Sequence, residues 1–467
     1  MTAALREQSP YLQGNFAPIE TEITACDLEV TGELPGDLEG IFVRNSPNPR
    51  YTPRGDYHWF DGDGMIHGVE IANGTATYRN RFVRTAGLAA DEDAGESLWT
   101  GILEPPDFSH PGEPYKDTAN TDLVYHNGRL LALWWLGGQP YVIGLPGLDT
   151  CGIETFGGNL KTGLSAHPKV DPVTGEMMFI DYQPVPPYLT YGVISADGEL
   201  VHQAPIELDG PRLQHDIAIT PDYSVLMDMS MMWDPEALAA GQVRLEFFED
   251  IPTRFGIIPR RGGNDDVVWF ECEPCFMYHT VNAWEHDGRV TMIGCRIPRP
   301  VAGMAGQDAE FPALARLSLE PYLHRWEFDL RTGIAKEEQL DDTLTEFPRM
   351  DNRILGRRSQ YAYSQRVAPG SELRFDGVVK YDTERDTQRV HEYPDGRFGG
   401  ETVFAPAGDG EDRGYLLTFV ADEASGESEL YVIDAQNVEE DPVARLRIPQ
   451  RVPYGYHTWW VGAAGLE

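Results

Sequence analysis

The pattern of hydrophobic and polar positions predicts short β-strands along almost the whole chain. Aromatic and β-branched residues surround His279 in the run over residues 275–284, and Asp287-Gly288 follows as the turn of a hairpin. Similar turn signals recur through the sequence, several of them beside short apolar runs such as residues 130–134. They are Asn73-Gly74, Asn127-Gly128, Asp197-Gly198 and Thr332-Gly333. This recurrence is typical of a β-propeller or a large β-sandwich.

Helical patterns are sparse. The best candidates are residues 234–240 and 311–316, each with a proline near its first turn, where a helix tolerates one. We expect these segments to be helices in loops on one face of the sheet protein, near an entrance. Residues 61–72 resemble a calcium-binding loop in their glycines and aspartates, but Ala72 stands where that loop requires a glutamate. We expect a tight turn there.

No low-complexity linker and no change of composition divides the 467 residues. The 10 Trp, 21 Tyr and 19 Phe supply enough apolar area for one large core. We therefore expect a single all-β domain over residues 1–467 rather than two or three smaller domains.

The chain carries a formal net charge of -38. Such a charge repels nucleic acid and anionic membranes, so we expect neither as a main partner. The first ten residues lack the basic start and apolar core of a signal peptide, and no run of 18 apolar residues follows. Five cysteines fit a reducing compartment, and the lone Cys272-Glu-Pro-Cys275 motif lacks the second pair of a zinc site. We expect a cytoplasmic protein.

Four histidines share the same setting, because His167, His215 and His457 lie, like His279, in or beside an apolar strand-like run. Any one of them alone would be a packed, hydrogen-bonded core residue. Their spacing does not place two of them on one helix, so a common site requires four strands far apart in sequence to meet. A radially closed sheet protein achieves this most readily. Four imidazoles suit iron or another borderline divalent metal, with carboxylates behind the rings.

Seven short motifs, in one order along the chain, resemble those of the carotenoid cleavage oxygenase family. This family includes apocarotenoid-cleaving and stilbene-cleaving dioxygenases and the retinoid isomerohydrolase. The motifs are GIFVR at 40–44, FDGDGM at 60–65, TANT at 118–121, AHPKVD at 166–171, HD at 215–216, HTVNAWE at 279–285 and YGYH at 454–457. Each motif is weak alone, but their joint order over almost the whole length is specific.

The resemblance implies a seven-bladed β-propeller with loops and short helices capping one face over an axial Fe(II). The ligands that it implies are His167, His215, His279 and His457. Glu346 and Glu401 match family glutamates that support His279 and His457, respectively.

The sequence departs from the family pattern at one position and allows two interpretations at another. The third supporting glutamate is absent, because the sequence reads Trp134-Trp135-Leu136 where it is expected. His215 is thus left to a water, a backbone carbonyl or another residue. Thr121 matches a threonine beside the open position of the iron, where its methyl restricts access. A buried threonine bonded to its own turn is the alternative.

The function that the resemblance implies is a non-haem Fe(II) dioxygenase. It would cleave a C=C bond of an apolar conjugated substrate with O2 into two carbonyl products. In the phenol-cleaving branch a tyrosine and a lysine hold the phenolic oxygen, and Ile102 and Trp134 stand at those positions here. With Phe60 and Trp135 we expect them to line the substrate site, which favours a carotenoid or apocarotenoid over a stilbene or an isoeugenol-like phenylpropanoid.

Two alternatives belong to other functional classes. One is a propeller that only binds a partner, with histidines that merely pack, because fold alone does not decide function. The other is an isomerase that uses the same iron as a Lewis acid and consumes no O2. Iron content separates the first alternative from an oxygenase. A peripheral contact with a membrane during substrate uptake is left open.

Overall fold

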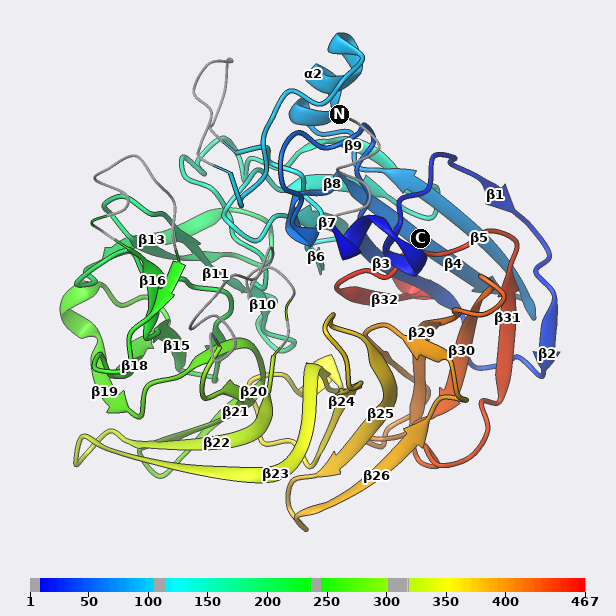
Figure 1. Ribbon diagram of the computed structural model, residues 1–467. Helices are drawn as coiled ribbons and strands as arrows, with labels where there is room; N and C mark the ends of the chain where they lie inside the picture. The colour runs from blue at the N-terminus through cyan, green and yellow to red at the C-terminus, as the bar shows by residue number, and fades with distance from the viewer. Residues whose placement is uncertain are drawn as a thin grey trace.

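The structure is a computed structural model that describes residues 9–104, 115–234, 236, 245–300, 317 and 319–466. These residues form an almost entirely β architecture, in which antiparallel sheets lie side by side around a common centre (Figure 1). Each of the five predicted hairpin turns joins two paired strands. The Asn-Gly and Asp-Gly turns at 73–74, 127–128 and 287–288 have positive φ at both residues, as the two-residue hairpin turn requires. The expectation of an all-β protein is confirmed.

One sheet joins the two ends of the chain. Its order is β1-β5-β4-β3-β32. The strands are β1 (Thr24–Ala25), β3 (Gly40–Pro47), β4 (Gly64–Ala72), β5 (Thr75–Phe82) and β32 (Thr458–Gly462). Strand β32 directly follows His457, and it pairs with β3 from Arg44↔Thr458 to Gly40↔Gly462. The register of this pairing therefore sets the position of His457.

Three four-stranded sheets follow in chain order. The first contains β6 (Asp122–His126), β7 (Arg129–Leu133), β8 (Tyr141–Gly144) and β9 (Asp149–Ile153). The second contains β10 (Lys169–Val170), β11 (Met177–Tyr182), β12 (Leu189–Ile194) and β13 (Leu200–Ile206). The third contains β14 (Ala218–Ile219), β15 (Tyr223–Asp228), β18 (Thr253–Pro259) and β19 (Val268–Cys272). Short first strands begin just after His167 in the second sheet and just after His215 in the third.

The largest sheet has 13 strands in the order β2-β31-β30-β29-β27-β25-β24-β23-β22-β21-β20, with β26 paired to β25 and β28 to β29. Its first members are β2 (Val30–Gly32), β20 (Phe276–His286), β21 (Arg289–Ile297), β22 (Tyr322–Asp329), β23 (Ile334–Arg349) and β24 (Tyr361–Val367). The others are β25 (Phe375–Asp382), β26 (Thr387–Glu392), β27 (Arg397–Gly399), β28 (Val403–Pro406), β29 (Gly414–Asp422), β30 (Ser428–Asp434) and β31 (Ala444–Ile448). Strand β16 (Met231–Trp233) pairs separately with β17 (Leu245–Phe247).

Helical segments are short. The α-helix α2 (Ala86–Ala94) begins at Thr85, whose hydroxyl accepts from Leu88 N–H, and ends at Gly95 in the left-handed conformation. The 3-10 segments are η1 (Pro10–Leu12), η2 (Gly14–Phe16), η3 (Trp59–Asp61), η4 (Asn264–Asp266), η5 (Asn352–Ile354) and η6 (Ala463–Gly465). Among the described residues no helix is long and apolar enough to cross a membrane.

The sequence expectations for helices had mixed outcomes. Helix α2 was missed, although Thr85 and Gly95 are ordinary signals for its start and its end. Of the two expected helices, 311–316 lies outside the described residues, as does 234–240 except for Asp234 and Glu236. The tight turn expected near residue 61 is the 3-10 segment η3, in which His58 accepts from Phe60 N–H and Asp61 accepts from His58 N–H.

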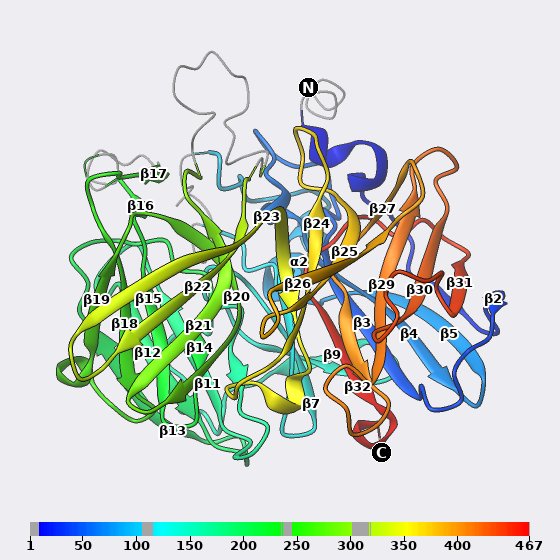
Figure 2. The same cartoon turned by 90° about the horizontal axis from the view of Figure 1, so that it is seen from below.

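The N-terminal segments cover one face of the centre. Figure 2 shows η1 and η2, in dark blue, at one face of the molecule and the C-terminal end at the opposite face. Tyr11 stacks on Trp59 with ring centroids 5.6 Å apart, and Phe16 meets both Trp59 and Tyr454 edge-on. Trp59 in turn packs against Tyr456, next to His457. From this aromatic layer, Trp59 and Tyr456 line a cavity that His457 also borders.

The pairing of β3 with β32 can be tested at Gly40. Its φ is +152°, and a Cβ at this position would lie 2.3 Å from the backbone oxygen of Val461 in β32. We expect Gly40→Ala to reduce the free energy of unfolding by on the order of 2 kcal/mol, because the added methyl must displace backbone. The midpoint of thermal unfolding measures this loss. Gly36→Ala is the control, since no atom lies within 4 Å of its added Cβ. Equal midpoints for the two variants would contradict the prediction.

Candidate metal centre

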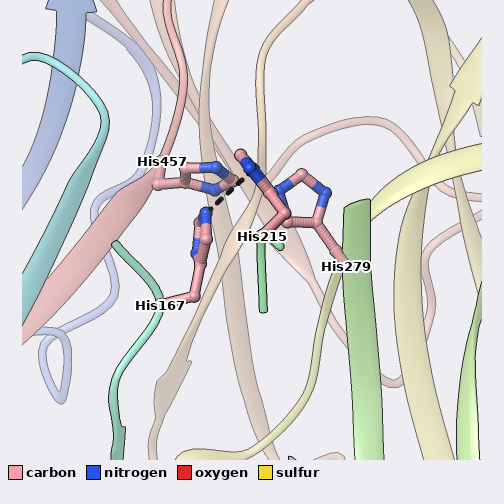
Figure 3. Close-up of side chains that lie close together, drawn as sticks. All are labelled: His167, His215, His279 and His457. Atoms are coloured by element: carbon pink, nitrogen blue, oxygen red, sulfur yellow. Dashed lines mark hydrogen bonds between the residues drawn. The ribbon is translucent and has the colours of Figure 1, made fainter. Parts of the chain in front are cut away.

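Four histidines converge at the centre of the molecule (Figure 3). Three lie within a few residues of the start of a strand: His167 before β10, His215 before β14 and His457 directly before β32. His279 lies within β20. All four are buried, and one ring nitrogen of each lies within 4.8 Å of the others. Across the described residues this is the one group of three or more His, Cys, Asp or Glu with such spacing, so Cys272 and Cys275 build no comparable site.

Two of the rings are held by buried glutamates. His279 Nδ1 lies 2.6 Å from Glu346 Oε2, and His457 Nδ1 lies 2.9 Å from Glu401 Oε1. A carboxylate can only accept, so Nδ1–H donates in both pairs and each Nε2 keeps its lone pair. His279 Nε2 is buried without a hydrogen-bond partner. An unpartnered buried nitrogen aimed at three other imidazoles fits a metal ion, and the donor set suits iron.

Glu401 is a strongly held anion. Its Oε2 accepts from Thr458 N–H at 2.6 Å, from the Thr458 hydroxyl at 2.8 Å and from Arg349 Nη2 at 2.8 Å. Burial alone would raise its pKa, but the Arg349 guanidinium and His457 outweigh burial and lower the pKa to about 2. Glu401 therefore stays ionised at neutral pH and fixes the tautomer of His457.

Burial keeps three of the four histidine rings neutral. It lowers the pKa of His167 and of His215 far below the usual histidine value, and the neighbouring imidazoles lower both further. Burial also lowers the pKa of His457, although Glu401 opposes this shift. Neutral rings offer the lone pairs that a divalent cation needs.

The other two rings lack a glutamate. Within the described part of the chain, the only hydrogen bond of the His215 ring joins its Nε2 to His167 Nε2 at 3.2 Å. Trp135 stands where the third supporting glutamate was expected, and its indole Nε1 has no hydrogen-bond partner. His167 Nδ1 lies 3.5 Å from Asp122 Oδ2. Sequence reasoning missed Asp122, although it directly follows Thr121 in the motif region, and it also missed Arg349.

An aromatic cavity borders His215, His279 and His457. Its other lining residues are mainly apolar and include Trp59, Phe60, Trp135, Tyr278, Phe347 and Tyr456. Two of the four residues expected to line the substrate site, Phe60 and Trp135, thus lie beside the histidines.

The other two expected residues lie elsewhere. Ile102 and Trp134 line a neighbouring cleft that shares Phe60 with the cavity. This cleft also contains Asp61, Asp63 and Lys116, so it is not the apolar surface that the sequence suggested. Burial raises the pKa of Asp61 to about 7, although Ile102 N–H and His58 N–H both donate to its carboxylate. The part of the chain around Trp134 therefore contributes to two distinct surfaces.

Thr121 lines the cavity with its hydroxyl already engaged. The hydroxyl donates to Asn120 Oδ1 at 2.8 Å and accepts from Trp135 N–H at 3.2 Å. The hydroxyl is therefore bonded as in the alternative interpretation, in which Thr121 is a buried threonine bonded to its own turn. The methyl is the part of the side chain without such bonds, so both interpretations of Thr121 are compatible with the structure.

A polar cleft also reaches the histidines. It borders His167, His279 and His457. Its charged lining residues are Asp122, Lys169, Asp216, Arg349 and Glu401. The centre thus lies between an aromatic surface and a charged one.

Comparisons with known proteins cover nearly the full chain. The family model for the retinal pigment epithelial membrane protein matches residues 16–462. A carotenoid 9,10(9′,10′)-cleavage dioxygenase 1 of Phaseolus vulgaris is 37% identical over 98% of this chain and 90% of the relative. A carotenoid cleavage oxygenase of Mycobacterium tuberculosis is 33% identical over 98% of both chains.

Solved structures agree with these relatives. A lignostilbene dioxygenase of Pseudomonas brassicacearum superposes with a TM-score of 0.89 at 30% identity, covering 98% of this chain and 99% of the other. A Synechocystis apocarotenoid oxygenase superposes with a TM-score of 0.83 at 26% identity, covering 96% and 97%. Matches of this length and identity show that the chain belongs to the carotenoid cleavage oxygenase family.

Proposed function

We propose that His167, His215, His279 and His457 hold Fe(II), and that the protein uses O2 to cleave a C=C bond of a carotenoid or apocarotenoid into two carbonyl products. The observation that carries the proposal is the convergence of four buried imidazoles at the edge of an aromatic cavity. The curated relatives at 37% identity, named as carotenoid 9,10-cleavage dioxygenases, support this reaction over a binding scaffold.

Fe(II), when bound, would supply open coordination positions for O2 beside the alkene. The chain's own residues have three tasks. Phe60, Trp135 and Phe347 pack against the apolar substrate and exclude water. Glu346 and Glu401 hold the rings of their histidines in one tautomer. The Thr121 methyl narrows access to the centre, and no side chain has to transfer a proton.

The substrate is a polyene rather than a phenol in this proposal. In the phenol-cleaving branch a tyrosine and a lysine hold the phenolic oxygen, and Ile102 and Trp134 stand at those positions here. Neither residue lines the cavity beside the histidines, so a phenol bound there would lack both partners, and an unpaired buried hydroxyl costs about 1–3 kcal/mol. The aromatic cavity favours apolar area at about 25 cal/mol per Å² removed from water. The similarity to a lignostilbene dioxygenase favours the alternative, a stilbene or isoeugenol-like substrate, and kinetics can separate the two.

We also propose one seven-bladed propeller domain over residues 1–467. Four separate sheets of four or five strands supply four blades. The 13-stranded sheet supplies three more if it divides within β23 and before β27. The register of β23 supports this division, because Leu344 pairs with β22 whereas Glu346 pairs with β24. A blade boundary at this point places Glu346 beside the axis.

The first prediction concerns the ligands. Alanine in place of His167, His215, His279 or His457, one at a time, is expected to lower iron occupancy and abolish cleavage, because each change removes a ligand nitrogen. Elemental analysis after anaerobic iron loading and product assays measure both effects. His202→Ala is the control, because this partly buried histidine bonds Gly262 O outside the centre. Wild-type iron content and turnover in His279→Ala would disprove the assignment.

The supporting carboxylates give a second prediction. Glu346→Gln and Glu401→Gln should each weaken iron binding by about 10–100-fold, because an amide holds the histidine less firmly than an anion does. Competition with a chelator measures the affinity. The matched control is Glu337→Gln, which alters a carboxylate 3.7 Å from His324, a histidine outside the centre. Full affinity in both test variants would show that neither glutamate supports a ligand.

Substrate class gives a third prediction. We expect kcat/KM for an apocarotenal to exceed that for a 4-hydroxystilbene by about 5–150-fold, the range for one unpaired buried hydroxyl. Steady-state kinetics on both substrates, with O2 uptake recorded, measure the ratio. A higher value on the stilbene would overturn the substrate class and leave the iron site intact. Product formation without O2 uptake would instead indicate an isomerase.

A further inference from the structure

Without the third glutamate, only two of the four histidines have a supporting glutamate. His279 and His457 each have a carboxylate on Nδ1, whereas Trp135 stands where the family pattern has a third glutamate. Four neutral ligands bring no negative charge to a divalent cation, so nearby carboxylates must supply it. Two buried aspartates beside the histidines, Asp122 and Asp216, are the remaining candidates in the polar cleft.

Asp216 is already committed. Its Oδ1 forms an ion pair with Lys169 Nζ and accepts from Ile217 N–H. Its Oδ2 accepts from Thr280 N–H at 2.7 Å and from the Thr280 hydroxyl at 2.8 Å. These bonds tie the segment before β14 to β20, so Asp216 has a structural role and its negative charge is offset by lysine.

Asp122 differs from Asp216 in its partners. This first residue of β6 is 4% exposed, and its Oδ2 accepts from His167 N–H at 2.9 Å while lying 3.5 Å from His167 Nδ1. Its Oδ1 accepts from Leu123 N–H at 2.8 Å. In the described part of the chain no lysine or arginine forms an ion pair with it. The nearby cations are used elsewhere, since Lys169 binds Asp216 and Arg349 binds Glu401.

Arg349 lies near enough for its charge to act on Asp122, but its direct partner is Glu401. A buried carboxylate without a directly paired cation is costly, which points to the metal-bound ring as its positive partner. A neutral His167 that offers Nε2 to a metal carries its proton on Nδ1, the nitrogen that faces Asp122. The separation of 3.5 Å is too long for a strong hydrogen bond, and a shift of about half an ångström would make one. His167 also has φ +68°, an uncommon conformation for a residue other than glycine.

We propose that Asp122 is the third supporting carboxylate of the centre, acting on His167 in compensation for the glutamate that Trp135 replaces beside His215. Asp122 is a positioning residue, because it acts through His167 and touches neither the metal nor the substrate. The inference rests on the proposed metal site. A purely structural role, in which Asp122 only accepts the two backbone N–H bonds, is the competing explanation.

The test is Asp122→Asn, which keeps the size of the side chain and an acceptor for His167 N–H but removes the charge. The probe is Co²⁺ added to metal-free protein, and the readouts are its affinity by chelator competition and the thermal midpoint of the metal-free protein. We expect about 10–100-fold weaker Co²⁺ binding with a little-changed midpoint. Asp181→Asn, another buried aspartate, is the control and should leave the affinity unchanged.

Other outcomes overturn the inference. Equal Co²⁺ affinity in Asp122→Asn and the wild type would contradict the inference. A loss of affinity accompanied by a large fall in the thermal midpoint would also contradict it, because that result indicates the structural role. Wild-type protein that binds neither Co²⁺ nor Fe²⁺ would instead defeat the proposed function itself. If Asp122→Asn folds poorly, Asp122→Ser is measured in the same way.

A second arm tests the compensation directly. Trp135→Glu restores a carboxylate beside His215, and in that background Asp122→Asn should lose several-fold less Co²⁺ affinity than it does alone. Additive losses in the double variant would show that the two positions do not substitute for each other.

Discussion

The burial of four imidazoles at one point is the constraint on which the rest of this structure depends. Burial lowers the pKa of His167, His215 and His457, which keeps the nitrogens of these rings available to a cation. Burial also makes any unpaired ring nitrogen or carboxylate costly. The histidines come from four separate sheet regions, so each strand register must be correct before any pair can form. The antiparallel closure of β3 on β32 is one such requirement, because it fixes His457 relative to residues more than 400 positions earlier.

The surroundings of the centre divide by polarity. Trp59, Phe60 and Trp135 line one side, where an apolar chain can replace water, and His279 and His457 border both sides. The other side gathers Asp122, Asp216 and Glu401, with Lys169 paired to Asp216 and Arg349 paired to Glu401. The division is not complete, because Glu346, which holds His279, lines the aromatic cavity, whereas Glu401, which holds His457, lies in the polar cleft.

Trp135 lies on the aromatic side. A tryptophan at this position adds aromatic surface to the cavity, and its backbone N–H donates to the Thr121 hydroxyl. It also removes a carboxylate that the family pattern places behind His215. Trp135 therefore adds aromatic area to the cavity at the position where the family has a negative charge. In our proposal Asp122, 3.5 Å from the His167 ring, compensates for the missing charge.

Much of this protein could be predicted from its sequence, because the relevant signals are local. Turn residues such as Asn127-Gly128 fix hairpins through their own backbone preferences, and the apolar run around His279 indicates a buried strand by itself. The order of short motifs identified the family and, through it, the pairing of Glu346 with His279 and of Glu401 with His457. Helix α2 was within reach of the same local reasoning, since Thr85 and Gly95 mark its ends.

Tertiary structure alone decided the contacts that depend on strand register. Ile102 and Trp134 turn out to line a cleft with Asp61 and Lys116 rather than the aromatic cavity, because adjacent residues such as Trp134 and Trp135 can serve different surfaces. Asp122 and His167 are 45 positions apart, and Arg349 and Glu401 are 52 apart. Sequence gives the charge of each of these residues, but only the packing of whole sheets determines which partner that charge meets.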